Sequence, residues 1–132
     1  MIGVAMSHED LPAILNRITQ ESFSDGLKMD NLLTRKEWAN ILGIHRYTLG
    51  RWEKDIIEEV NPIKSAYFGN ERRMRSPYLD AYQRFIIALI FVAKGGLDRK
   101  NKPHKIAINF LKMNFSTLKR EHFEQWRQAY VN

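Results

Sequence analysis

The sequence predicts a mostly α-helical fold, a winged helix-turn-helix with a short β-hairpin wing and flanking helices. Three observations predict it. Residues 33–54 have the apolar spacing of two short crossing helices, a Gly69-Asn70 turn lies between apolar residues, and a nearly apolar stretch follows Ser76-Pro77. A chain of 132 residues can bury a single core. It has no cysteine, which excludes disulfides and thiolate metal sites.

Residues 1–32 are predicted to form an N-terminal helical arm. Asp10 precedes apolar residues at helical spacing and can cap a helix, which Ser24-Asp25-Gly26 is expected to end. An apolar stripe on this helix must be covered, either by the core or by a second subunit. The stripe consists of Leu11, Ile14, Leu15 and Ile18.

A winged helix-turn-helix domain is expected over 33–94, beginning with helices over 34–42 and 45–57. Thr34 and Glu37 form a T-x-x-E capping box for the first helix. Ala39 is small enough for the helices to cross, and Gly43 tolerates the positive φ of the turn. The apolar interior comes from Trp38, Leu42, Ile44, Leu49 and Trp52.

Asn61-Pro62 is expected to stop the second helix, and a β-hairpin wing is predicted over 63–75. Ser76-Pro77 resembles an N-cap followed by a first-turn proline, and it predicts a core helix up to Lys94, ended by Gly95-Gly96. A C-terminal helical tail over 95–132 follows. It contains a basic loop over 97–103, helices near 104–114 and 118–130, and an apolar stripe of Phe123, Trp126 and Tyr130 that we interpret as a packing and dimerisation surface.

Charge is unevenly distributed along the chain, whose formal net charge is +6. Residues 1–33 carry two basic and five acidic groups, net −3, whereas residues 34–54 carry five basic and two acidic groups, net +3. Residues 94–105 carry five basic groups and one acidic group, net +4. A basic region of this kind suits a polyanionic partner, and general solubility would not require an acidic first third.

The predicted second helix carries the main candidate residues for binding double-stranded DNA. Arg46, Tyr47 and Arg51 are candidates for contacts to base edges and the backbone, or else they form a solvated face. His45 could contact phosphate or be a plain turn histidine. Thr48 could meet a thymine methyl group or a phosphate, or bond within its own helix.

Two further groups of candidates flank that helix. Arg35 and Lys36, in the first turn of the first helix, are expected to reach phosphate, or else are ordinary surface charges. The predicted wing could enter a minor groove; if there is no wing, the same residues are a charge run before a helix. The wing candidates are Asn70, Arg72, Arg73 and Arg75.

The order of helix-turn-helix, wing and helix resembles the MerR-type winged helix-turn-helix regulators. Thr48-Leu49 and Trp52-Glu53 match that family's T-L-x-x-W/Y-E recognition helix, and the resemblance covers residues 33–92. Gly50 replaces a common arginine, and Gly95-Gly96 and Pro103 interrupt the long helix that usually leads to an effector domain. The resemblance therefore implies a small regulator without an evident effector domain. It further implies a role beside a mobile element, such as a CRISPR-associated transposon, which no residue pattern here indicates.

These observations predict a sequence-specific double-stranded-DNA-binding transcriptional regulator, a repressor acting as a homodimer on an inverted repeat. The alternatives are an excisionase or architectural factor of a mobile element, and a protein-docking adaptor that does not bind DNA. Four scattered histidines and the absence of nucleophile or P-loop motifs argue against an enzyme. We expect no cofactor, metal, small-molecule effector or membrane association, and a cytoplasmic, nucleoid-associated location.

Overall fold

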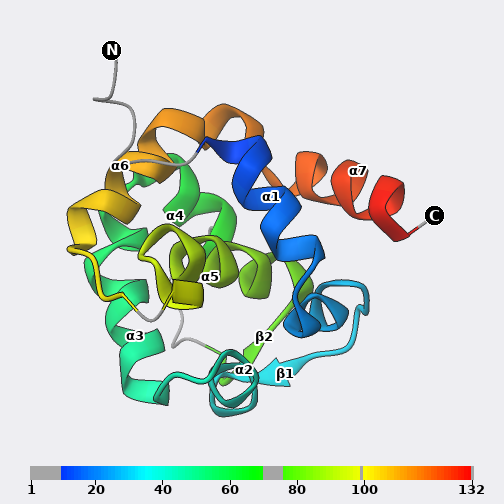
Figure 1. Cartoon of the computed structure of the whole chain (residues 1–132), viewed down its shortest axis with the longest axis horizontal. Helices are drawn as coiled ribbons and strands as arrows, with labels where there is room; N and C mark the ends of the chain where they lie inside the picture. Colours follow the sequence, from blue (N-terminus) through cyan, green and yellow to red (C-terminus); the bar gives the residue numbers. More distant parts are fainter. Residues whose placement is uncertain (1–9, 70–75, 99, 132) are drawn as a thin grey trace.

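The computed structural model describes residues 10–69, 76–98 and 100–131, and it is mostly helical with one small antiparallel sheet (Figure 1). In chain order, the α-helices are α1 (Leu11–Thr19), α2 (Arg35–Leu42), α3 (Arg46–Asp55), α4 (Asn61–Phe68), α5 (Ala81–Ala93), α6 (His104–Asn114) and α7 (Arg120–Val131). Short 3₁₀ helices are η2 (Ser22–Leu27), η3 (Ile57–Glu59), η4 (Gly96–Asp98) and η5 (Phe115–Thr117). The strands are β1 (Leu33–Thr34) and β2 (Tyr78–Leu79).

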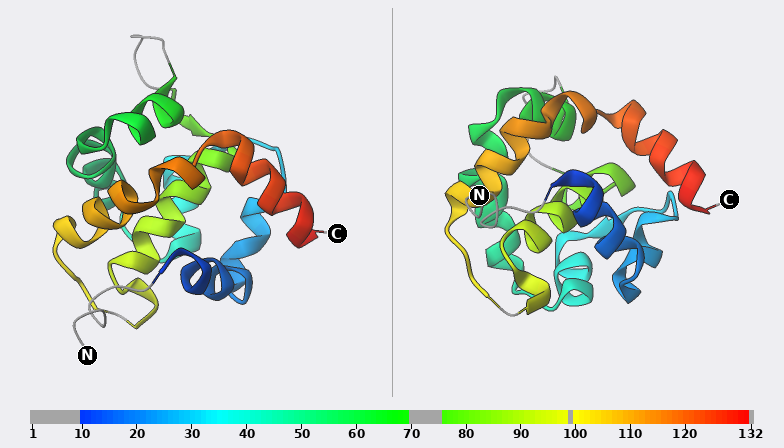
Figure 2. Two further views of the ribbon diagram at one scale, coloured as in Figure 1. Left: turned by 90° about the horizontal axis from the view of Figure 1, so that it is seen from above. Right: turned by 45° about the horizontal axis from the view of Figure 1, so that its top comes forward.

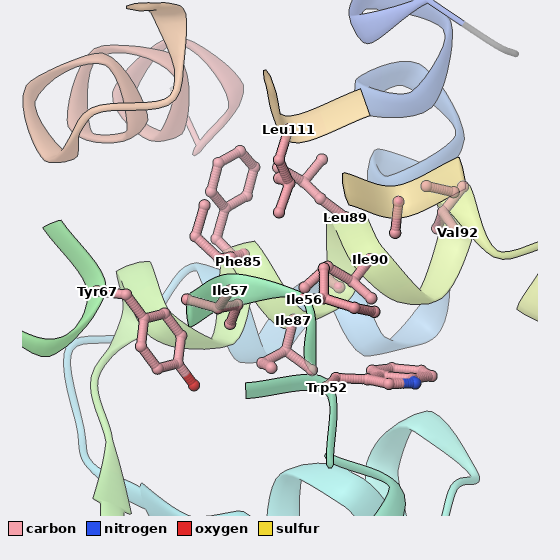
Figure 3. Close-up of a cluster of buried hydrophobic side chains, with 14 of the residues drawn as sticks. Trp52, Ile56, Ile57, Tyr67, Phe85, Ile87, Leu89, Ile90, Val92 and Leu111 are labelled. Atoms are coloured by element: carbon pink, nitrogen blue, oxygen red, sulfur yellow. The ribbon is translucent and has the colours of Figure 1, made fainter. Parts of the chain in front are cut away.

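Helix α5 lies at the centre of the molecule, and every other α-helix is arranged around it (Figures 1 and 2). Nearly all of its side chains are buried, as the apolar sequence predicts. Figure 3 shows Phe85, Ile87 and Ile90 of α5 among Trp52 and Ile57 from the α3–η3 segment. The predicted arm, middle and tail therefore contribute to one shared core.

The N-terminal helix α1 begins as predicted but ends earlier. The Asp10 side chain accepts a hydrogen bond from the Ala13 amide at 3.0 Å. The helix stops at Thr19, whose hydroxyl donates to the Asn16 carbonyl at 2.7 Å and so competes with the helical hydrogen bonds. The prediction that Ser24-Asp25-Gly26 ends α1 is wrong, because these residues lie within η2.

The predicted helix-turn-helix pair is confirmed as a pair of helices. The Thr34–Glu37 capping box is present at the start of α2. Gly43 ends α2 with a φ of 79°, a conformation that only glycine adopts without strain. Ala39 is fully buried where the helices cross, together with the side chains of Trp38 and Leu49.

The prediction of a β-hairpin over 63–75 is wrong for its first half, because residues 61–68 form α4. Proline in the first turn of a helix loses no hydrogen bond, so Asn61-Pro62 begins α4 instead of only stopping the helix before it. Ile63 and Tyr67, four positions apart, are both buried. This spacing is helical, whereas the strand prediction relied on apolar residues beside a Gly69-Asn70 turn signal.

The two strands join distant parts of the chain instead of forming a hairpin. Leu33 pairs with Leu79 and Thr34 pairs with Tyr78 in an antiparallel register. Ser76-Pro77 precedes β2, so the prediction that it caps the central helix is also wrong. The cap of α5 is Asp80, which forms a capping box with Gln83.

The described residues of both apolar stripes pack within the same chain. Ile14 and Ile18 of α1 are buried in the shared core. Phe123 of α7 is also buried, with its ring centroid 4.8 Å from that of Phe85 on α5, and Trp126 packs 5.2 Å from the same ring. The stripes therefore no longer argue for a dimer interface; the side chain of Tyr130 lies outside the described residues.

Candidate nucleic-acid interface

Helix α3 presents one continuous exposed face. Its buried side is formed by Leu49, Trp52 and Glu53. On the opposite side, Tyr47, Arg51 and Lys54 follow one another at intervals of four and three residues, and all three are exposed. Sequence reasoning missed Lys54, although its spacing from Arg51 already placed it on this face.

The start of α3 carries an exposed cluster of two rings and a guanidinium group. His45 is the N-cap, and its Nδ1 accepts a hydrogen bond from the Tyr47 amide at 3.1 Å. The two rings stack with their centroids 4.9 Å apart, and the Arg46 guanidinium lies 5.1 Å from the Tyr47 ring centroid. Tyr47 is 66% exposed, so the cluster is ordered by its own contacts while it faces solvent.

Two residues of α3 differ from this pattern. Thr48 is half-buried at the edge of the face and not in its middle. Gly50 lies among the outward residues, and a Cβ atom added to it would meet no atom within 4 Å. The α3 backbone is therefore open to close approach between Tyr47 and Lys54.

Arg35 is part of a network inside the protein, although the sequence suggests a phosphate contact. Its guanidinium donates to both carboxylate oxygens of Glu53, at 2.8 and 2.9 Å, and to the Ser76 carbonyl. The Tyr67 hydroxyl donates to the same Glu53 carboxylate at 2.6 Å. This cluster joins α2, α3 and α4, and the sequence did not reveal it. Lys36, the next residue, is exposed.

Burial and charge set the ionisation of this network. Burial and the neighbouring Glu53 carboxylate raise the pKa of Tyr67 well above its usual value. Burial acts to lower the pKa of Arg35, but the hydrogen bonds that its guanidinium donates to Glu53, together with the negative charge of that carboxylate, outweigh burial and raise the pKa of Arg35. Around neutral pH, Tyr67 is therefore a neutral donor and Arg35 a cation.

The four wing candidates, Asn70, Arg72, Arg73 and Arg75, lie outside the described residues. The structure does describe the residues on either side of that segment. Tyr67 precedes it and Ser76 follows it, and both bond to the Arg35–Glu53 pair. Tyr67 and Ser76 therefore both lie close to the buried side of α3.

Other kinds of site find no counterpart in the described part of the chain. Within residues 10–69, 76–98 and 100–131, histidine and acidic residues nowhere gather in a group of three that could hold a metal ion. No helix in these ranges is both long and apolar enough to cross a membrane. Comparisons with family models, curated proteins and solved structures find no match to this chain.

Proposed function

We propose that this protein is a sequence-specific double-stranded-DNA-binding regulator that uses α3 as its reading helix. The observation that carries the proposal is the exposed face of α3. It presents Arg46, Tyr47, Arg51 and Lys54, and the acidic residues of this helix lie elsewhere, with Glu53 buried and Asp55 at the edge. A repressor acting as a homodimer on an inverted repeat is the form that we propose, in keeping with the resemblance to MerR-type regulators.

The proposed mechanism follows from the size and chemistry of α3. An α-helix fits the major groove of B-DNA, where an arginine can bond to guanine O6 and N7 together. Arg46 and Arg51 lie on the outward side and have no carboxylate partner among the described residues. Their donors are therefore available to base edges or phosphates. Lys54, exposed near the end of the helix, would contact the DNA backbone.

The Glu53 network supports this use of α3 by fixing the helix in place. A reading helix must keep its orientation relative to the rest of the protein, because a small rotation moves its side chains away from the base edges. Glu53 is buried and bonded from α2 and from α4. The motif Trp52-Glu53 therefore anchors the helix from its inner side.

A homodimer is proposed because a single reading helix would give too little sequence specificity. One reading helix contacts only a few base pairs, which gives too small a preference over competing genomic sites. Two-fold symmetry would place a second helix one or two turns of DNA away. Since α1 and α7 are covered by the core of their own chain, this proposal assigns no interface to either helix.

Salt dependence of binding tests the proposal. If about six phosphates are neutralised, the logarithm of the binding constant should fall with the logarithm of salt concentration at a slope of about −5. The measurement is a fluorescence-anisotropy titration of a labelled duplex at several salt concentrations. A slope between about 0 and −1 would rule out DNA binding of this kind.

A further inference from the structure

The loop between α5 and α6 is folded tightly around a buried lysine. Lys94 is 4% exposed, and its ammonium group donates to the Lys102 carbonyl at 2.5 Å and lies 2.9 Å from Nδ1 of His104. Two backbone hydrogen bonds also join the two ends of the loop. The Lys102 amide donates to the Lys94 carbonyl at 3.1 Å, and the Lys100 amide donates to the Gly95 carbonyl at 2.9 Å. The described residues of the loop therefore have a defined position.

This loop is connected to the end of α3. His104 begins α6, and its Nε2 lies 3.8 Å from the Asp55 carboxylate at the last turn of α3. Burial and the charge of Lys94 lower the pKa of His104, while Asp55 acts in the opposite direction. The imidazole is therefore neutral near pH 7. It can accept from Lys94 at Nδ1 and present its Nε2 hydrogen toward Asp55.

Glu53 and Asp55 mark opposite flanks of α3. Residues two positions apart on an α-helix point about 200° apart. Glu53 faces Arg35 and Tyr67, and Asp55 faces His104 at the end of the loop. The exposed face with Tyr47 and Lys54 lies between them. In Figures 1 and 2, the yellow chain leading into α6 runs on the side of the molecule that carries α3.

We propose that the α5–α6 loop is a second phosphate-binding surface, which grips the DNA backbone on the Asp55 flank of α3. The side chains assigned to it are Lys100 and Lys105, both exposed and on either side of the anchored Lys102–His104 segment. A lysine makes a point-charge contact to phosphate and carries no base information. This inference rests on the proposed function, since it names additional contacts to the same duplex.

The test compares two double variants in the salt titration. Lys100→Gln with Lys105→Gln removes two charges from the loop. Lys112→Gln with Lys119→Gln removes two exposed charges from the end of α6 and the residue before α7, which lie away from α3. We expect the loop variant to reduce the steepness of the salt slope by about 2, on cognate and random duplexes alike. The control variant should leave the slope near the wild-type value.

The outcomes separate this inference from the proposed function. If the wild-type slope is steep and the two double variants have equal slopes, the second surface is wrong and DNA binding by α3 stands. If the wild-type chain shows no salt-dependent binding, the proposed function itself fails. Circular dichroism of each variant shows whether it is folded, and exposed Lys-to-Gln changes should leave the spectrum unchanged.

Discussion

At the scale of single residues, the Glu53 carboxylate is the group whose environment matters most. It is buried, and Arg35 satisfies both of its oxygens. Arg35→Ala would remove the guanidinium that binds both oxygens of this buried carboxylate. We expect a loss of about 3 kcal/mol in the free energy of unfolding, since breaking a buried ion pair costs far more than removing a surface charge.

The measurement is urea denaturation of Arg35→Ala beside Lys36→Ala. Lys36 is the adjacent residue and is exposed, so its replacement should change stability by less than about 0.5 kcal/mol. Equal stability of the two variants would contradict the structural role assigned to Arg35. That result would favour the phosphate contact that the sequence predicted for Arg35.

Two buried tyrosines predict a loss of stability at alkaline pH. Burial raises the pKa of Tyr82 to about 12 and that of Tyr67 well above its ordinary value. The unfolded chain releases these protons near pH 10, before the folded protein does. The stabilisation is therefore complete below about pH 10 and is lost as the pH rises above it, by up to about 1.4 kcal/mol per pH unit for each tyrosine.

Denaturant titrations between about pH 8 and pH 11 measure this effect. Tyr82→Phe should be less stable at neutral pH, because it loses the hydrogen bond to the Leu118 carbonyl at 2.6 Å. Its stability should nevertheless fall less steeply than that of the wild type above about pH 10. Parallel curves for the two proteins would show that Tyr82 does not titrate as described.

Replacing Gly50 by alanine is expected to raise the stability of the fold and to lower its affinity for DNA. Glycine inside a helix costs about 0.5–1 kcal/mol relative to alanine, and no neighbouring atom requires glycine here. Gly50→Ala should therefore stabilise the fold by that amount. It should also weaken DNA binding, because the new methyl group would stand on the face that approaches the base edges.

The matched control is Asn40→Ala, an exposed position on α2. It should also stabilise its helix, by a few tenths of a kcal/mol, and leave DNA affinity unchanged. If Gly50→Ala is more stable and binds the duplex as tightly as the wild type, then the duplex does not approach the α3 backbone closely at this position.

At the scale of elements, the sequence predicted helix ends correctly where a local motif is compatible with a single structure. The Thr34–Glu37 box and Gly43 predict the ends of α2, and the structure has both. Asn61-Pro62 fits the end of one helix as well as the start of the next, and Ile63 with Tyr67 fits a strand face as well as a helix face. Distant contacts decide such cases, and a single sequence does not show them.

Helix α7 gives a prediction at this scale. Phe123 is buried against Phe85 and Tyr82 of the same chain. Phe123→Ala should therefore cost about 3–4 kcal/mol in unfolding free energy, independently of protein concentration. Urea denaturation at two protein concentrations checks this. A loss of stability that disappears on dilution would instead place α7 in a subunit interface.

At the scale of the whole molecule, the basic stretch from residue 34 onward divides into separate roles. Arg35 supports the fold, Arg46 and Arg51 face outward, and Lys94 organises a loop. Net charge per segment predicts none of these roles. Sequence reasoning could identify α3 and its outward residues because helical periodicity separates its two sides. It could not find the Glu53 and Lys94 networks, whose members come from different elements.

Selection from a pool of random duplexes tests the central claim most directly. The wild-type protein is expected to enrich one short sequence, arranged as an inverted repeat if the protein binds as a dimer. Arg46→Ala and Arg51→Ala should each lose about 1–3 kcal/mol on the enriched sequence and little on random DNA, while Lys112→Ala should behave like the wild type. The account would be contradicted if no sequence is enriched, or if both arginine variants enrich the wild-type sequence with undiminished affinity.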